Sequence, residues 1–516
     1  MRFSLNFSKR FLLIKISVIA FLATILFSCT SDERGLAESF QLAGNNRQEI
    51  KKTLEHFNAE KNSKKIRAAE FLLSQMKYQF HHEGTSKDRY DSLLNILSKV
   101  PYERMEKLEF IWDSLRKSIK TPIRDDAYLV CDLKNISSQN LIEHIDAAFE
   151  AWNKPWSKNI SFGDFCEYIL PYKLVNEQPD KWMVNIQKRY HYLAEKNSSQ
   201  ADPYQMCLAI NNQLKKDFKI RSFPSIWDLN FHELDMLKSG KCYHATQYTT
   251  YVMRSLGIPI AMDFTPYWGN MNGGHEWNAL IFNGHPVPFI GSESDPGLTK
   301  IDLARQRRRA KIFRRTYSFQ QQSLAALTKD PLDIPALFRS AQLRDVTDQY
   351  IAVSDAVVDN LPSGQNGTPL YLCVFNRQEW VPTAWAMIKH GKSKFEKMGR
   401  DIIYLPMYYQ SGELSAAGSP VLINSKGLSV QINDNGDKTK LVIKQKSPEG
   451  PGITKGQEYE LLIWQGKWKP VEKRTASADS IVYNGVSKNA LYRITSKDKM
   501  SKERIFIIDN CKPLWK

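Results

Sequence analysis

The spacing of apolar residues changes along the chain from three and four positions to two. Helical spacing covers 47–57 and 65–78, and a second helical block runs from about 138 to 194. Short alternating or β-branched segments dominate after about residue 370, at 371–375, 402–409, 428–432 and 441–446. Asn435-Gly436 predicts a hairpin turn there, and Gln465-Gly466 predicts another between strands at 459–464 and 467–471. These strands favour one or two β-sandwich modules.

The middle of the chain combines both patterns. A helix is predicted over 242–256, because Gly257 and Pro259 follow as stop signals. Strands are predicted at 258–264, 276–282 and 287–290, with Asn283-Gly284 as a tight turn between the last two. Helices and strands in separate blocks predict an α+β protein.

The N-terminus reads as a secretion signal. Arg2, Lys9, Arg10 and Lys15 precede an apolar run of about 16–27, which is short for a membrane-spanning helix. The following Leu26-Phe27-Ser28-Cys29 resembles a lipobox, which implies cleavage before Cys29 and a lipid on its thiol. The lipid would anchor the protein in a membrane without a spanning helix. A lipid-anchored outer-membrane location is expected, and the acids in Thr30-Ser31-Asp32-Glu33, which resemble export signals of surface lipoproteins, favour the cell surface while leaving the periplasmic side open.

Composition narrows the class further. The chain has 516 residues and a formal net charge of +17, and its apolar and charged fractions are typical of globular proteins. The positive charge would allow contact with anionic glycans or membranes, whereas no nucleic-acid motif is present and no nucleic-acid partner is expected. Beyond Cys29, the cysteines are widely spaced and form no CxxC, which is unlike a small disulfide scaffold.

Chemistry is predicted at Ser239-Gly240-Lys241-Cys242-Tyr243-His244. A cysteine at the first turn of a helix faces unpaired backbone N–H groups, which favour its thiolate. A thiolate attacks amide carbonyls, and the same N–H groups can hold the oxyanion that develops. About thirty residues later, Gly273-Gly274-His275-Glu276-Trp277 places His275 at a strand start, where it can serve as the base.

The order of these motifs, with Leu256-Gly257-Ile258-Pro259 between them, is similar to the transglutaminase-like core of papain-like thiol enzymes. The resemblance covers about 224–295 and implies Cys242 as nucleophile and His275 as base. The family's aspartate after the next strand has no counterpart in register within 286–291, so Glu293, and after it Asp295, is the expected acid. Trp227 is an upstream tryptophan that would lie near the oxyanion or line the groove.

Other readings of the same residues stay open. Cys242 could be structural, or could join His232, His244 and His275 in a metal site, although the spacing matches no known zinc motif, so neither metal nor cofactor is expected. The pair His81-His82 and the basic run 305–315 are each expected on a solvated face, with polyanion binding as the alternative for the run. Trp380 and Trp385 are core tryptophans or an aromatic platform for a sugar.

The expected organisation is a signal peptide at 1–28, a helical region at 29–125, a transglutaminase-like core with its helical lead-in at 126–300, a β-sandwich module at 301–425 and a β-rich module at 426–516. The helical lead-in at 165–171, the core, and the tail segments 459–461, 489–492 and 503–506 together resemble envelope lipoproteins with transglutaminase-like domains from gut-type Gram-negative bacteria. The expected function is amide hydrolysis or acyl transfer by a thiol enzyme on peptides or proteins. The alternative is an inactive scaffold whose β-sandwiches bind glycan or protein.

Overall fold

The computed structural model describes residues 34–100, 110, 114, 126–221, 226–297, 307–444, 452–496 and 504–516. The predicted signal peptide and the lipid site at Cys29 lie outside these residues. Within the described part, no helix is both long enough and apolar enough to cross a membrane. Helices and antiparallel sheets form successive blocks, so the α+β class is confirmed.

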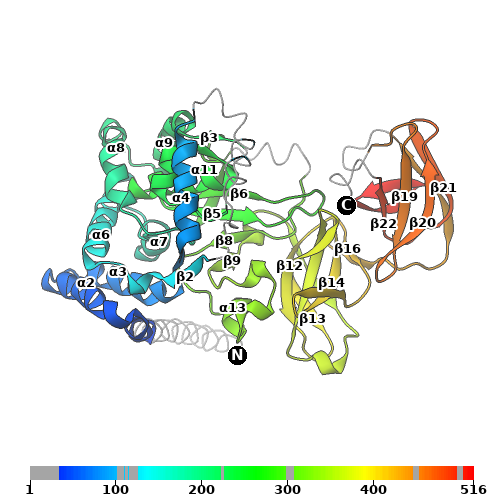
Figure 1. The fold of residues 1–516 in the computed structure, drawn as a ribbon, viewed down its shortest axis with the longest axis horizontal. Coiled ribbons are helices and arrows are strands. Elements are labelled where there is room, and N and C mark those ends of the chain that lie inside the picture. The colour runs from blue at the N-terminus through cyan, green and yellow to red at the C-terminus, as the bar shows by residue number, and fades with distance from the viewer. Residues whose placement is uncertain are drawn as a thin grey trace, which may run out of the picture.

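Three parts follow one another along the long axis of the molecule (Figure 1). The first is helical and also holds two small strand pairs, β1 with β2 and β3 with β4. Its elements are α2 (Arg47–Ala59), α3 (Ser63–Gln75), β1 (Phe80–Glu83), α4 (Thr85–Ser98), β2 (Tyr128–Cys131), α6 (Ser138–Trp152), α7 (Phe162–Tyr168), α8 (Trp182–Lys196), α9 (Pro203–Asp217), β3 (Lys219–Ile220), α10 (Phe231–Leu237), β4 (Ser239–Gly240) and α11 (Cys242–Ser255).

Capping residues and glycines set the ends of these helices. The Ser161 hydroxyl accepts from the backbone N–H of Asp164 at 3.1 Å and caps the start of α7. Gly257 has a φ of 81° just past α11, and a Cβ there would lie 2.2 Å from the carbonyl oxygen of Ala151. Only glycine therefore fits both this left-handed turn and the contact with α6.

A five-stranded antiparallel sheet in the order β7-β6-β5-β8-β9 lies against α11. Its strands are β5 (Ile260–Thr265), β6 (His275–Phe282), β7 (His285–Phe289), β8 (Phe313–Arg315) and β9 (Leu343–Asp345). Asn283 and Gly284 have φ values of 50° and 77°, so the predicted tight turn between β6 and β7 is confirmed. Because β8 and β9 belong to this sheet, it crosses the boundary predicted at residue 300.

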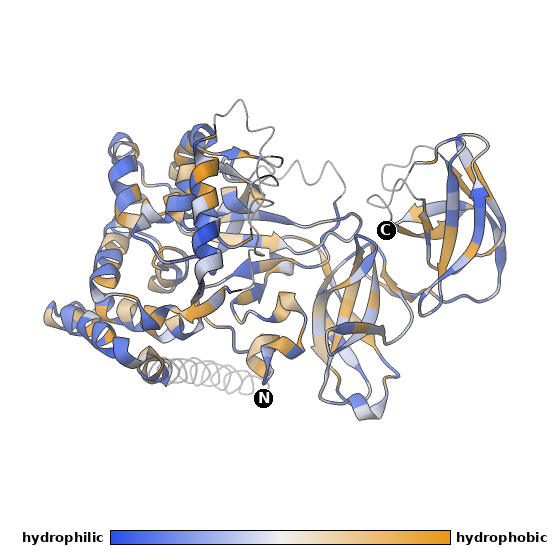
Figure 2. Cartoon of the chain, in the orientation of Figure 1, coloured by the Kyte–Doolittle hydropathy of each residue, from blue (hydrophilic) through white to orange (hydrophobic). Residues whose placement is uncertain are grey.

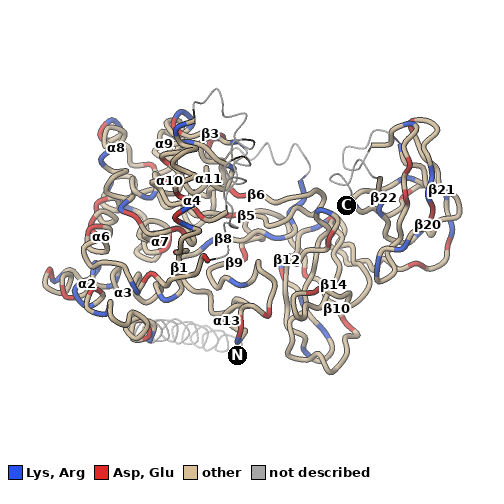
Figure 3. The backbone as a smooth tube through the Cα atoms, in the orientation of Figure 1, with Lys and Arg blue, Asp and Glu red and all other residues tan. Residues whose placement is uncertain are grey.

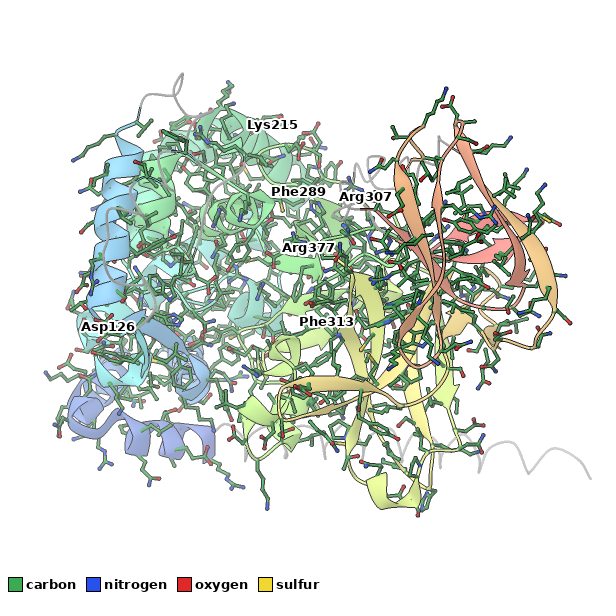
Figure 4. All side chains as sticks on the ribbon, turned by 45° about the vertical axis from the view of Figure 1, so that its right-hand side comes forward. Asp126, Lys215, Phe289, Arg307, Phe313 and Arg377 are labelled. Carbon is green, nitrogen blue, oxygen red and sulfur yellow. The ribbon has the colours of Figure 1, made fainter. Side chains whose placement is uncertain are left out.

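The second part is built on a six-stranded sheet, which contains β11 (Pro369–Asn376), β12 (Glu379–Met387), β14 (Ile402–Gln410), β15 (Glu413–Ala416), β16 (Val421–Ile423) and β17 (Ser429–Gln431). One face packs against the pair β10 (Val353–Val358) and β13 (Ser393–Gly399). The other face packs against Phe264, Phe313 and a helical turn, α13 (Leu324–Leu327). Figure 4 labels Phe313 where the central sheet meets this second part.

The third part is a sandwich of β18 (Lys438–Lys444) and β21 (Ser480–Ser487) against a five-stranded sheet. That sheet contains β19 (Glu458–Trp464), β20 (Trp468–Thr475), β22 (Tyr492–Thr495), β23 (Ile505–Asp509) and β24 (Lys512–Trp515). Apolar positions are orange in Figure 2, and the buried ones of this part form one core cluster between the two sheets. Buried Arg504 ties this part to the others, since it donates to the carbonyls of Gly269 (2.9 Å) and Phe375.

Two strand predictions had different outcomes. The hairpin around Gln465-Gly466 is confirmed, because β19 and β20 pair antiparallel on either side of it. The hairpin around Asn435-Gly436 is wrong: β17 pairs with β16, whereas β18 pairs with β21. The turn signal is local, and the partners of each strand were decided by long-range packing. The boundary predicted between 425 and 426 likewise falls inside the β16–β17 pair.

The expectation of a solvated basic run at 305–315 is also wrong for its described part. Residues 310–314 are buried, and β8 is an inner strand of the central sheet. Arg314 makes a two-pronged pair with buried Asp263, at 2.8 and 2.7 Å, and Tyr350 donates its hydroxyl to the same carboxylate. Asp263 of β5 allows Arg314 to be buried, Glu276 of β6 holds Arg315 partly buried, and nothing in the run itself reveals these partners.

Candidate active site

Cys242 is the first residue of α11, as predicted, and its side chain is partly exposed. Among the other described cysteines, all are free thiols, and four are buried in cores (Cys131, Cys166, Cys207 and Cys373), while Cys511 is exposed near the C-terminus. Cys242 alone among them combines partial exposure with a helix N-terminus. Cys242 therefore lies where the sequence predicted it, at the first turn of a helix.

The chain just before Cys242 is held from two sides. The parallel pair β3–β4 fixes Ser239 and Gly240, and a Cβ at Gly240 would lie 2.5 Å from Nδ1 of His244. That nitrogen accepts from the backbone N–H of Lys241 at 3.2 Å. Burial lowers the pKa of His244 to about 4, so its ring is neutral and can accept this bond. His244 thus caps the helix that presents the thiol.

The thiol meets the start of β6. There the backbone N–H of Glu276 lowers the pKa of Cys242, against the effect of burial. This stretch of β6 is an open edge, because β7 ends at Phe289 (labelled in Figure 4), opposite Asn278. In the same register, position 292 would stand opposite His275, and β7 stops short of it. The first two residues of β6 therefore remain accessible to the thiol.

The imidazole of His275 lies among aromatic rings. Its centroid is 6.1 Å from that of Trp268 and 6.0 Å from that of Trp277, with nearly parallel planes. Side chains alternate along a strand, so His275 and Trp277 lie on one side of β6 and Glu276 and Asn278 on the other. The side-chain amide of Asn278 donates to the carbonyl of Thr246 in α11 at 3.0 Å. Glu276 and Asn278 therefore lie on the face of the sheet that packs against α11. The alternation therefore places the ring of His275 on the face of the sheet that points away from α11, against the indoles of Trp268 and Trp277.

The two acids proposed as partners of His275 lie in the loop after β7. Asp295 forms an ion pair with Lys215 of α9, which gives this carboxylate another role. The same loop is fixed to α9 by Asn211, which bonds the backbone of Ser292 at 2.9 Å and of Ser294 at 2.8 Å. Glu293 is exposed. Of the two, Glu293 alone keeps a carboxylate without an ion pair among the described residues, so it stays the predicted third member.

Two charged residues beside the thiol were not predicted. The buried carboxylate of Glu276 accepts from Nε (2.9 Å) and Nη2 (2.7 Å) of Arg315, both at Oε1. Burial raises the pKa of Glu276, and Arg315 opposes this. The motif Gly-His-Glu-Trp contains Glu276, but its partner lies 39 residues away in the basic run. The pairing of β5 with both β6 and β8 brings the two together.

The environment opposes the thiolate expected from the helix N-terminus. Burial raises the pKa of Cys242 above its ordinary value, and the Glu276 carboxylate raises it further. The N–H groups of Glu276, Tyr243 and Cys242 act in the other direction but do not prevail. The sulfur is therefore a protonated thiol at neutral pH, and attack on a carbonyl requires a base to take the proton.

The remaining predicted residues lie elsewhere. Trp227 is buried and packs edge-on against Tyr90 of α4 at 5.2 Å, with His82 at 6.0 Å, which fits a core residue. His81 is buried rather than solvated, and bonds Asp132. Trp380 is buried against Phe375 and so belongs to the core. Among the described residues, metal-ligand spacing is found only at His56, Glu60 and Asp146, away from Cys242.

Comparisons with known proteins do not assign the chain to a family. No family model and no curated protein matches the chain. Among solved structures, a candidate cysteine protease from Cytophaga hutchinsonii matches 21% of this chain and 38% of its own, with 17% identity and a TM-score of 0.18. Red sea bream transglutaminase matches over 64% of this chain and 73% of its own, with 8% identity and a TM-score of 0.20. At these scores neither likeness carries weight for fold or function.

Proposed function

We propose that the protein is a thiol enzyme of transglutaminase-like architecture that acts on amide bonds of peptides or proteins. The observation that carries the proposal is the thiol of Cys242, which is partly exposed at the first residue of α11 and lies near Glu276, the neighbour of His275 in β6. Cys242 would attack the amide carbonyl. His275 would take the thiol proton across the open edge of β6 and pass it to the leaving amine.

The raised pKa of Cys242 determines the order of proton transfer. A thiol that is protonated at rest must lose its proton as it attacks, so His275 acts as a general base during the reaction. Backbone N–H groups at the start of α11, with that of Glu276, would receive the oxyanion. Hydrolysis is favoured over crosslinking, because water is always present and no motif marks an amine acceptor. The enzyme would act at the envelope, held by a lipid on Cys29.

An inactive scaffold is the second candidate, and the raised thiol pKa is the observation that favours it. In that case the β parts of the chain would bind glycan or protein. The burial of Trp380 leaves Trp385, which is partly exposed, as the one member of the proposed sugar platform that a ligand can reach.

A functional test uses the chain from Thr30 onward with casein as substrate. Ammonia release reports side-chain amide hydrolysis, new α-amines report peptide-bond hydrolysis, and incorporation of dansylcadaverine reports acyl transfer. We expect one of the hydrolytic signals, abolished in Cys242→Ala and lowered about a hundredfold or more in His275→Ala. A signal unchanged in Cys242→Ala would refute this site as its source.

The test also covers the acid. If Glu293 orients His275, Glu293→Gln lowers the turnover rate by about a hundredfold or more and leaves substrate binding nearly unchanged. Asp295→Asn is the matched control, since its carboxylate pairs with Lys215. Equal activity of both variants would remove Glu293 from the site.

A further inference from the structure

Two sheets each end in an edge strand that pairs on one side only, and both edge strands line the same groove. Strand β12 forms the edge of the six-stranded sheet and pairs only with β11, and β9 forms the edge of the central sheet and pairs only with β8. A groove of about 990 Å³ is lined by both edges, by β13 and by residues around α13. Its lining includes neither Cys242 nor His275, so it is separate from the candidate active site.

The backbone of both edges is directed toward the groove. The N–H of Ile388 donates inward to the carbonyl of Thr368 at 2.9 Å. Hydrogen-bonding groups alternate along an antiparallel strand, so the N–H and C=O groups of Trp385 and Met387 point outward. On the opposite edge, the N–H of Val346 donates inward to Ile312, which leaves the groups of Leu343 and Asp345 pointing outward. Both edges thus offer the pattern that an added strand would satisfy.

The groove carries an excess of positive charge. Six cations line it (Lys311, Arg344, Lys389, Lys392, Lys394 and Lys397), against two acids, Asp345 and Glu396. Lys311, Lys394 and Lys397 already have carboxylate partners. Among the described residues, Arg344, Lys389 and Lys392 form no ion pair, and all three are exposed. Figure 3 shows the positions of Lys and Arg in blue around β9 and β12.

Apolar side chains occupy the floor and rim of the same groove. Phe313 and Phe338 are buried in its floor, and Trp385 and Met387 are partly exposed along β12. Leu327 is 55% exposed at the rim. On the other side of β12 the small residues Ala384 and Ala386 line the groove but are buried in the core against β13. An added strand would therefore find apolar contacts for one set of its alternating side chains.

We propose that this groove binds an extended acidic peptide segment, which adds to β12 as a further strand. The outward N–H and C=O groups of Trp385 and Met387 would pair with the peptide backbone. Arg344, Lys389 and Lys392 would bind its acidic side chains, and the apolar floor would receive the residues between them. Backbone pairing supplies affinity in this mode, and side-chain contacts supply specificity.

Fluorescence anisotropy of a fluorescein-labelled ten-residue peptide of alternating Glu and Val tests the proposal. Met387→Pro removes the outward N–H, at a strand edge where proline is tolerated, and Met387→Ala removes only the side chain. We expect Met387→Pro to weaken binding about tenfold or more, and Met387→Ala to weaken it less than about threefold. Lys389→Glu with Lys392→Glu should also weaken binding at least about tenfold, whereas Lys426→Glu with Lys440→Glu, the same charge change outside the groove, should not.

Two further ligands separate strand addition from simple attraction of anions. The same peptide with alternate backbone nitrogens methylated keeps its charges but cannot pair as a strand, and we expect it not to bind. An oligogalacturonate tests for an acidic saccharide. Equal binding of the methylated peptide, equal affinities of Met387→Pro and wild type, or binding of the oligogalacturonate in place of the peptide would each overturn the proposal.

Discussion

Two buried carboxylates in this molecule have opposite pKa shifts. Asp132 lies in the helical part, where Oδ1 contacts Nδ1 of His81 (2.6 Å) and Oδ2 accepts from Tyr172 (2.5 Å) and Lys173 (2.9 Å). Its pKa is lowered, because these partners outweigh burial. Glu276 lies beside Cys242, and burial raises its pKa even though Arg315 contacts one of its oxygens.

We infer from this difference that the Asp132 cluster is structural and that the Glu276 cluster belongs to the proposed site. The partners of Asp132 come from β1 and from the loop after α7, so its carboxylate joins these two segments. Both of its oxygens have hydrogen-bond partners. Glu276 has fewer partners and a thiol as neighbour, and residues that retain such perturbed pKa values concentrate at functional sites. The two clusters should therefore respond differently to loss of the carboxylate charge.

The largest expected effect is a loss of stability on substitution of Asp132. In Asp132→Asn, the buried ammonium of Lys173 loses its counter-charge, and we expect a loss of about 3–5 kcal/mol in unfolding free energy. Urea unfolding followed by circular dichroism measures it, using the first transition because the chain has several parts. Glu143→Gln breaks an exposed pair with Lys181 and serves as the control, with no measurable change. Equal stability of both variants would show that the Asp132 cluster is not what joins these segments.

The next largest effect is expected on the pKa of the Cys242 thiol. Because the Glu276 carboxylate raises the pKa of Cys242, Glu276→Gln should lower that pKa and shift the rise of iodoacetamide alkylation to lower pH. At pH 7.5 we expect alkylation about tenfold faster, which corresponds to one pKa unit. The double variant Glu276→Gln with Arg315→Gln removes both charges and should shift the profile less. An unchanged or higher midpoint in Glu276→Gln would contradict this electrostatic account.

The sequence predicted the local features of this site and missed the distant ones. The start of α11 at Cys242, its end before Gly257 and the turn at Asn283-Gly284 follow from signals a few residues long. Pairs such as Glu276 with Arg315 and His81 with Asp132 join residues 39 and 51 positions apart. No periodicity encodes them, so Arg315 and His81 were expected in solvent, whereas Arg315 is in a partly buried ion pair and His81 is buried against Asp132.

The smallest effect on stability is expected at Asp295, which is partly exposed. Asp295 pairs with Lys215 on the surface of α9, where both side chains contact solvent. Asp295→Asn should cost less than about 1 kcal/mol and leave the alkylation profile of Cys242 unchanged. Thermal unfolding and the same alkylation series check this. A shifted profile would mean that the loop after β7 reaches the thiol, and would bring Asp295 back as the acid of the site.

The central claim is that Cys242 is a nucleophile served by His275. Its most direct test is the reaction with p-nitrophenyl acetate in a Cys511→Ser background, which removes the exposed cysteine. We expect a burst of about one equivalent of p-nitrophenolate, with the acetyl group on Cys242 by peptide mapping, no burst in Cys242→Ala, and a burst about a hundredfold slower or more in His275→Ala. No burst in the parent protein, acetylation at other residues, or equal rates with and without His275 would contradict the claim.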